Sequence, residues 1–230
     1  MHLPLGESPE KIRVGRAGAR VLFAFIGLAL AAGVFAPWHA ARAVSCGFGS
    51  AIGGGQCRGF ITDTAQTTWT VPSDWNSSSN TIEVIGGSGS GADGAGSNHG
   101  GGGGGGGAYA EVSNLNLAAG NSIPIQVGAG GQTLTFLSGS STFFNASTCS
   151  GASVCAAGGS GGNGQTGGAG GTVAASVGTM IFAGGNGGNG GGTATNGGGG
   201  GGAAGPNGAG NNALRLLTIM PIYRHQFATG

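Results

Sequence analysis

The residues most suggestive of chemistry lie between positions 89 and 99. Residues 89–94 read Gly-Ser-Gly-Ala-Asp-Gly, a literal G-x-G-x-x-G that follows an apolar run. In dinucleotide-binding proteins this motif opens a helix whose N-terminus meets the pyrophosphate. Here it leads into eight consecutive glycines at 100–107, a composition that cannot sustain a helix. The match therefore predicts no nucleotide site, and a P-loop is excluded because Lys11 is the only lysine.

His99 is the candidate base of this region. A catalytic imidazole needs a nucleophile and an orienting acid beside it. Ser97 and Asp93 are close in sequence, but loop spacing does not show that they meet, so we expect His99 to be solvated. A secreted hydrolase is the rival interpretation, and it lacks an evident carboxylate pair or triad. The calcium-binding repeat G-G-x-G-x-D does not recur in register, so we expect no calcium site. Together with the lack of a triad or carboxylate pair, this leads us to predict no catalytic, cofactor or metal site.

Four cysteines, Cys46, Cys57, Cys149 and Cys155, lie beyond a predicted export signal. In an oxidising compartment an even number of cysteines indicates disulfides, and four cysteines allow three pairings. We favour Cys46–Cys57 with Cys149–Cys155, which close the shortest loops, each in a Gly/Ser-rich turn. The C-x10-C and C-x5-C spacings match no common zinc finger and have no neighbouring His.

The N-terminus has the order of a secretory signal. Basic residues (Lys11 and three arginines) precede an uncharged apolar stretch at 21–36, and the small-residue site Ala41-Arg42-Ala43 follows. The uncharged stretch is shorter than the roughly 20 residues that span a bilayer. We predict cleavage after Ala43, membrane contact only through the signal before cleavage, and a secreted, periplasmic or cell-surface protein.

Glycine dominates the composition, with 58 residues of 230. Charged residues are 7% of the chain, and residues 44–212 contain Arg58 as their only Lys or Arg against five acids. Binding nucleic acid requires a basic face that neutralises phosphates. We therefore expect no nucleic-acid partner.

Short apolar runs separated by turns predict an all-β sandwich. The expected strands are 68–71, 81–85, 109–117, 122–127 and 133–137. Large apolar residues concentrate before residue 145, so we expect that the front half can hold a core and that the back half cannot hold one. Trp69 and Trp75 are expected to pack under a sheet rather than to form a sugar platform.

Residues 145–212 contain 27 glycines, many of them in triplets such as GGS, GGN and GGT. A period of three suits the polyproline-II-type helix, which has three residues per turn and no internal hydrogen bonds. We expect a bundle of polyglycine-II helices joined through their backbones, with 100–107 in its interior. The expected outward side chains are Ser160, Asn163, Ala169, Asn186 and Asn189. Disorder is the alternative for so glycine-rich a chain.

The order of several motifs resembles the bacterial and bacteriophage glycine-rich domain family. The motifs are Trp-Thr-Val-Pro at 69–72, then 81–87, 103–110, Val-Gly-Ala-Gly-Gly at 127–131, and 183–188. The resemblance covers about residues 60–210, and family members include tail-fibre adhesins and exported proteins of unassigned role. It implies a β-sandwich coupled to polyglycine-II helices, surface exposure and adhesion. It supplies no catalytic residues.

These observations divide the chain into four parts. They are a signal peptide at 1–43, a Cys-containing segment at 44–67, a glycine-rich domain at 68–212 (strand-rich to 144, polyglycine-rich from 145) and an atypical tail at 213–230. The tail is either a frameshifted end or a genuine C-terminal strand. We expect a non-enzymatic structural or adhesive module that binds a cell-surface polysaccharide or protein. An ice-binding or matrix-forming protein is the alternative.

Overall fold

The computed structural model describes residues 45–94, 99–132, 136–192 and 196–213. The predicted signal with its cleavage residues Ala41 and Ala43, and all but the first residue of the predicted tail, lie outside these ranges. Within them, no helix has both the length and the apolar character needed to cross a membrane.

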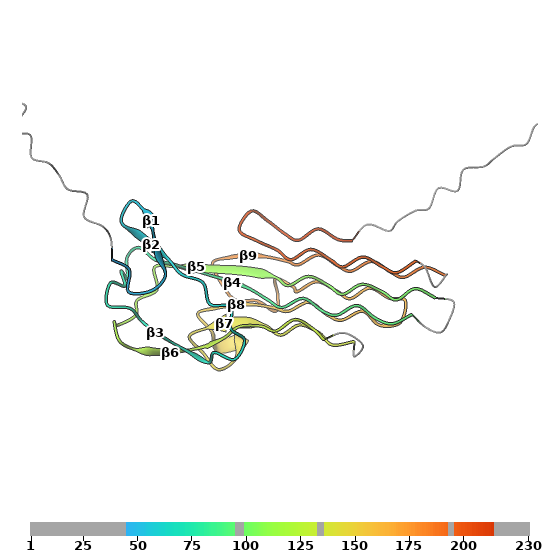
Figure 1. Cartoon of the computed structure of the whole chain (residues 1–230), viewed down its shortest axis with the longest axis horizontal. Coiled ribbons are helices and arrows are strands. Elements are labelled where there is room, and N and C mark those ends of the chain that lie inside the picture. The colour runs from blue at the N-terminus through green and yellow to red at the C-terminus, as the bar shows by residue number, and fades with distance from the viewer. Residues whose placement is uncertain (1–44, 95–98, 133–135, 193–195, 214–230) are drawn as a thin grey trace, which may run out of the picture. The chain divides into compact units, whose positions relative to one another are not determined.

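The fold is all-β (Figure 1). The described strands are β1 (Ser50–Gly53), β2 (Gln56–Arg58), β3 (Thr68–Thr70), β4 (Thr81–Ile85), β5 (Tyr109–Ser113), β6 (Ser122–Gln126), β7 (Thr142–Phe144), β8 (Val154–Ala156) and β9 (Met180–Phe182), with a short 3-10 helix at Cys149–Gly151. β1 and β2 form a hairpin. The other strands form two antiparallel sheets, ordered β3-β6-β7-β8 and β4-β5-β9.

Four of the five predicted strands are confirmed, and β4 has the predicted bounds. β5 ends at Ser113, earlier than predicted, because Asn114 takes a positive φ of 57° and leaves the sheet. The strand predicted at 133–137 falls largely outside the described residues, and Phe136 and Leu137 do not belong to a strand. β7 and β8 were not predicted, since three residues are too few for an alternating pattern to be recognised.

The two sheets enclose one hydrophobic core, which makes the predicted sandwich. Trp69 is buried, and its ring meets those of Trp75 and Phe144 at centroid distances of 5.6 and 5.5 Å. This confirms the expectation that the two tryptophans pack inside. The back half of the chain also contributes, because Val154 and Ala156 are fully buried in the core. Most of the buried core residues nevertheless lie before residue 145, where the sequence predicted a core.

The predicted disulfide pairing is confirmed. Cys46 pairs with Cys57, at a Cα–Cα distance of 5.8 Å, and holds the β1–β2 hairpin. Cys149 pairs with Cys155, at 5.4 Å, and joins the 3-10 helix to β8. Cys155 is fully buried. The second disulfide therefore fixes the strand from which a glycine segment departs.

Extended glycine segments continue from the strands (Figure 1). We call residues 100–108, which lead into β5, the central segment. Its neighbours are residues 86–92 after β4, 157–164 after β8, 168–171, 184–191 after β9, and 198–204. Each is joined to the central segment by backbone hydrogen bonds of 2.8–3.1 Å. The octaglycine run therefore lies inside the bundle, as predicted.

The hydrogen bonds of the central segment repeat every three residues. Gly102 and Gly105 donate to Gly164 and Ser160 of one neighbour. Gly103 and Gly106 donate to a different neighbour, residues 184–191. Successive amides thus turn to different partners, as helices with three residues per turn require. The bonds have the period expected of polyglycine-II helices, and glycines with this period recur in the flanking segments.

Glycine is required in the central segment because the neighbouring backbones approach too closely for a side chain. A Cβ built on Gly105 would overlap the carbonyl oxygen of Ala169, and one on Gly102 would overlap that of Thr166. By contrast, a Cβ on Gly200, at the surface of the bundle, would lie 3.8 Å from its nearest neighbour, the carbonyl oxygen of Gly104. A side chain is therefore sterically excluded at the central glycines Gly102 and Gly105 but can be accommodated at the surface glycine Gly200.

We expect Gly105→Ala to lower the free energy of unfolding by about 3 kcal/mol or to prevent folding, because backbone atoms must move apart. Gly200→Ala should leave the stability unchanged or raise it by about 0.5 kcal/mol, since Ala reduces the entropy of the unfolded chain. Thermal and denaturant unfolding of the two variants would measure this. Equal stabilities would contradict the close packing of the central segment.

Candidate functional site

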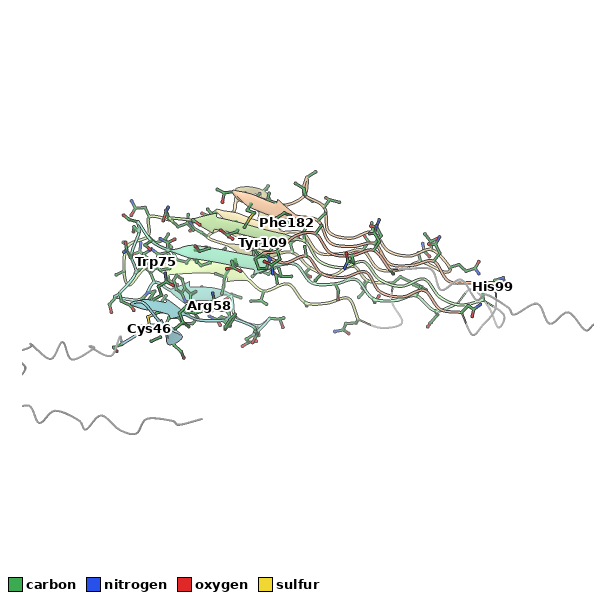
Figure 2. All side chains as sticks on the ribbon, turned by 90° about the horizontal axis from the view of Figure 1, so that it is seen from above. Cys46, Arg58, Trp75, His99, Tyr109 and Phe182 are labelled. Atoms are coloured by element: carbon green, nitrogen blue, oxygen red, sulfur yellow. A yellow bond between two sulfur atoms is a disulfide. The ribbon has the colours of Figure 1, made fainter. Side chains whose placement is uncertain are left out.

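Loops gather at the end of the glycine bundle farthest from the strands. We call this end the tip and define it as residues 93–94, 99, 163–166, 190–192 and 196. Figure 2 places His99 there, at the opposite end from Trp75 and Cys46. Gly100 donates to the carbonyl of Gly191, and Gly102 to that of Gly164. These bonds hold three separate stretches of chain together at one end.

A tight turn at Asn163–Thr166 forms one corner of the tip. The backbones of Asn163 and Thr166 each donate to the other's carbonyl at 2.9 Å. The Gln165 side chain donates to the carbonyl of Gly191 at 2.9 Å, and Gly190 donates to the Gln165 carbonyl. The turn is therefore fastened to the neighbouring loop by both main-chain and side-chain bonds.

Several short polar side chains are exposed at the tip. They are Asp93, His99, Asn163, Thr166 and Asn196. His99 is exposed, in agreement with the expectation of a solvated side chain. Ser97, its candidate nucleophile, lies outside the described residues. No group of three His, Cys, Asp or Glu residues suited to a metal is present in the described ranges.

The G-x-G-x-x-G match at 89–94 lies in an extended segment. Gly89 donates to the carbonyl of Gly105, and Ala92 to that of Gly102. No helix begins within the described residues of this motif, and the amides of Gly89, Ser90 and Ala92 already donate to backbone carbonyls. The motif therefore lacks the helix N-terminus that would meet a phosphate. The geometry agrees with the interpretation of this motif as a chance match.

The loop at 76–80 lies at the strand end of the molecule. Asn80 donates to the carbonyls of Asn76 and Leu115 at 2.8 and 3.0 Å, and its own Oδ1 accepts from the Leu115 amide. Trp75, just before the loop, also donates to the Leu115 carbonyl. These polar groups hold the loop to the sandwich. This loop and the tip therefore do not form one site.

Two of the predicted outward asparagines close the edge of the bundle. The side chains of Asn186 and Asn189 accept hydrogen bonds from the amides of Gly170 and Gly167, at 2.9 and 2.8 Å. Asn212 does the same for the amide of Asn186, at 2.7 Å. Where an edge amide lacks a backbone carbonyl, the side-chain amide oxygen replaces it. The predicted exposure of these asparagines is confirmed, and their bonding role was missed.

A carboxylate pair that sequence reasoning missed lies on the outer face of the β4-β5-β9 sheet. The register places Glu83 directly opposite Glu111. The Tyr109 hydroxyl donates to Glu111 Oε2 at 2.8 Å, and the Tyr109 ring stacks on Phe182 (Figure 2). Burial, followed by the hydrogen bond to Glu111, raises the pKa of Tyr109 well above its usual range. Glu111 thus accepts a hydrogen bond from Tyr109, a residue of its own strand.

A sequence model described as "glycine-rich domain" matches residues 61–219, more than half of the chain. The chain belongs to the glycine-rich domain family. Comparisons with curated proteins and with solved structures gave no match. The glycine-rich domain match includes β3 to β9 and the glycine segments, whereas the Cys46–Cys57 hairpin lies outside it.

In this glycine-rich domain, Asn186→Ala should lower the free energy of unfolding by about 1 kcal/mol, because the Gly170 amide loses its partner. The matched control is Asn163→Ala, since the Asn163 side chain makes no hydrogen bond in the described structure. Denaturant unfolding would compare the two variants. Equal effects would show that the edge bonds do not stabilise the bundle.

Alkaline pH should destabilise the domain through Tyr109. Its folded pKa is raised, so the protonated hydroxyl stabilises the fold up to the unfolded pKa of about 10 and loses this contribution as pH rises further. Tyr109→Phe should reduce the loss of stability above about pH 10. Unfolding curves across this range would test the sign, and an unchanged pH dependence in the variant would contradict it.

Proposed function

We propose that the protein is a secreted or surface-exposed, non-enzymatic module whose tip binds a cell-surface polysaccharide or protein. The observation that carries this proposal is the tip itself: exposed polar side chains on loops that a glycine bundle holds in place. Binding residues commonly lie on loops positioned by a rigid scaffold. The resemblance to tail-fibre adhesins adds support for adhesion, and the two disulfides favour an oxidising compartment.

The chemistry of the tip favours a neutral, hydrogen-bonding ligand. Its exposed groups are amides and a hydroxyl, with one carboxylate at Asp93 and one imidazole at His99. So few charges cannot steer a charged partner from a distance. Sugar hydroxyls and peptide amides match such donors and acceptors, and we place the ligand among these two classes.

The ice-binding or matrix-forming alternative gains less support. Ice binding would need a regular row of free side chains along a flat face. Asn186 and Asn189 are regularly spaced, but their Oδ1 atoms accept hydrogen bonds from neighbouring amides. The row therefore serves the cohesion of the bundle, and the tip remains the better-supported binding surface.

The full chain, exported to an oxidising compartment and labelled, should bind bacterial cells or their extracted surface polysaccharides saturably. Replacing Asp93 and His99 together by Ala should weaken this binding by about tenfold, a loss of about 1.4 kcal/mol. Unlabelled protein should compete for the same sites. Cell-binding isotherms would measure both effects.

Ser78→Ala is the matched control, because Ser78 is exposed in the loop at the strand end and its hydroxyl makes no hydrogen bond in the described structure. It should bind as the unmodified chain does. A folded, disulfide-closed protein that binds none of these surfaces would refute the adhesive role. Equal losses in both variants would refute the tip as the site.

A further inference from the structure

The ring of neighbours around the central segment is open on one side. In a helix with three residues per turn, successive N–H groups point in three directions, and successive C=O groups point in three directions between them. A fully surrounded helix therefore has six neighbours. Five are found in the described ranges. Hydrogen bonds also link these neighbours in order, from 86–92 through 157–164, 168–171 and 184–191 to 198–204. No described bond joins the first to the last.

The open side has a row of unused donors. Gly101, Gly104 and Gly107 each accept a hydrogen bond at their carbonyl, from Gly198, Gly201 and Ala204. Their own N–H groups donate to no group in the described structure, although every other residue of the central segment donates. The three amides are three residues apart, about 9 Å in such a helix. Their spacing is that of a missing sixth neighbour.

These amides are not simply surface groups. Gly104 and Gly107 are buried, and Gly101 is half-buried. Buried backbone amides are nearly always paired, because an unpaired one costs about as much as a lost hydrogen bond. The flanking segments add unused acceptors, since the carbonyls of Gly89 and Gly201 receive no backbone hydrogen bond in the described ranges. Donors on the floor and acceptors on both sides define a groove.

The sides of this groove are bare over part of its length. A Cβ built on Gly91, Gly197 or Gly200 would meet one atom within 4 Å, a carbonyl oxygen of the central segment at 3.7–3.9 Å. These three glycines therefore lie over the floor of the groove and face open space. An extended backbone without side chains on its inner faces fits such a channel, as the existing neighbours do on the other sides.

We propose that this groove binds an extended segment of another polypeptide that has glycine at two of every three positions. Its carbonyls would accept from Gly101, Gly104 and Gly107, and its amides would donate to the flanking carbonyls. The described Gly-Gly-x segments of this chain are already held in its own bundle. We therefore assign the occupant to a different polypeptide, independently of what the tip binds.

A labelled peptide of Gly-Gly-Asn repeats tests this directly. Fluorescence anisotropy with the full chain should show saturable binding, and a peptide of Ala-Ala-Asn repeats should not bind. Hydrogen exchange by NMR should show the amides of Gly101, Gly104 and Gly107 exchanging faster than that of Gly103 until the peptide is added. Slow exchange of the three amides without peptide would overturn the proposal, as would equal binding of both peptides.

Gly200→Leu should place a side chain in the groove without a clash at its Cβ, which would lie 3.8 Å from the Gly104 carbonyl oxygen. It should weaken peptide binding by about tenfold or more. Ala169→Leu is the control. Ala169 is exposed on residues 168–171, the middle member of the five neighbours and thus opposite the groove. Unchanged binding by Gly200→Leu would refute the groove as the site. A dimer of the free chain that Gly200→Leu dissociates would instead make a second copy the occupant and overturn our assignment.

Discussion

In the glycine bundle, hydrogen bonds join extended backbones directly to one another. At the distance that these bonds require, no Cβ fits between two backbones, and the rest of the bundle follows from this limit. The central segment meets this limit on five sides, and a Cβ at Gly102, Gly105 or Gly106 would overlap a neighbouring carbonyl. Cohesion therefore comes mainly from peptide groups, and glycine is required at the positions where a Cβ would overlap a neighbouring backbone. Small side chains such as those of Ser90 and Ala204 are buried, and at the edge asparagines replace missing backbone acceptors.

The sandwich helps to offset the entropic cost of ordering the glycine segments. Ordering glycine costs more conformational entropy than ordering any other residue, and extended segments form no hydrogen bonds within themselves. β4, β5, β8 and β9 lead directly into or out of glycine segments. The hydrophobic core, with Trp69 and Val154 inside it, thus helps to set the register in which the segments pair. The Cys149–Cys155 disulfide fixes one of these starting points.

The three-residue glycine period predicted the bundle, and the octaglycine run predicted its centre, because both follow from local composition. The disulfide pairing also followed from short loops. Other features depend on which segments become neighbours, and a single chain does not reveal this. The bonding of Asn186 to Gly170 and the opposition of Glu83 and Glu111 require the register between distant stretches. The open side of the ring depends on how many segments surround the centre.

Burying peptide groups rather than carbon has a thermal consequence. On unfolding, exposed apolar surface raises the heat capacity, whereas exposed polar surface lowers it. The glycine segments expose mainly amides and Cα groups, so their share of the heat-capacity change is small for their length. The stability of this domain should therefore curve less steeply with temperature than that of a carbon-packed domain of equal size. The glycine bundle is then less sensitive to cold than the sandwich, because its cohesion owes little to the hydrophobic effect that weakens on cooling.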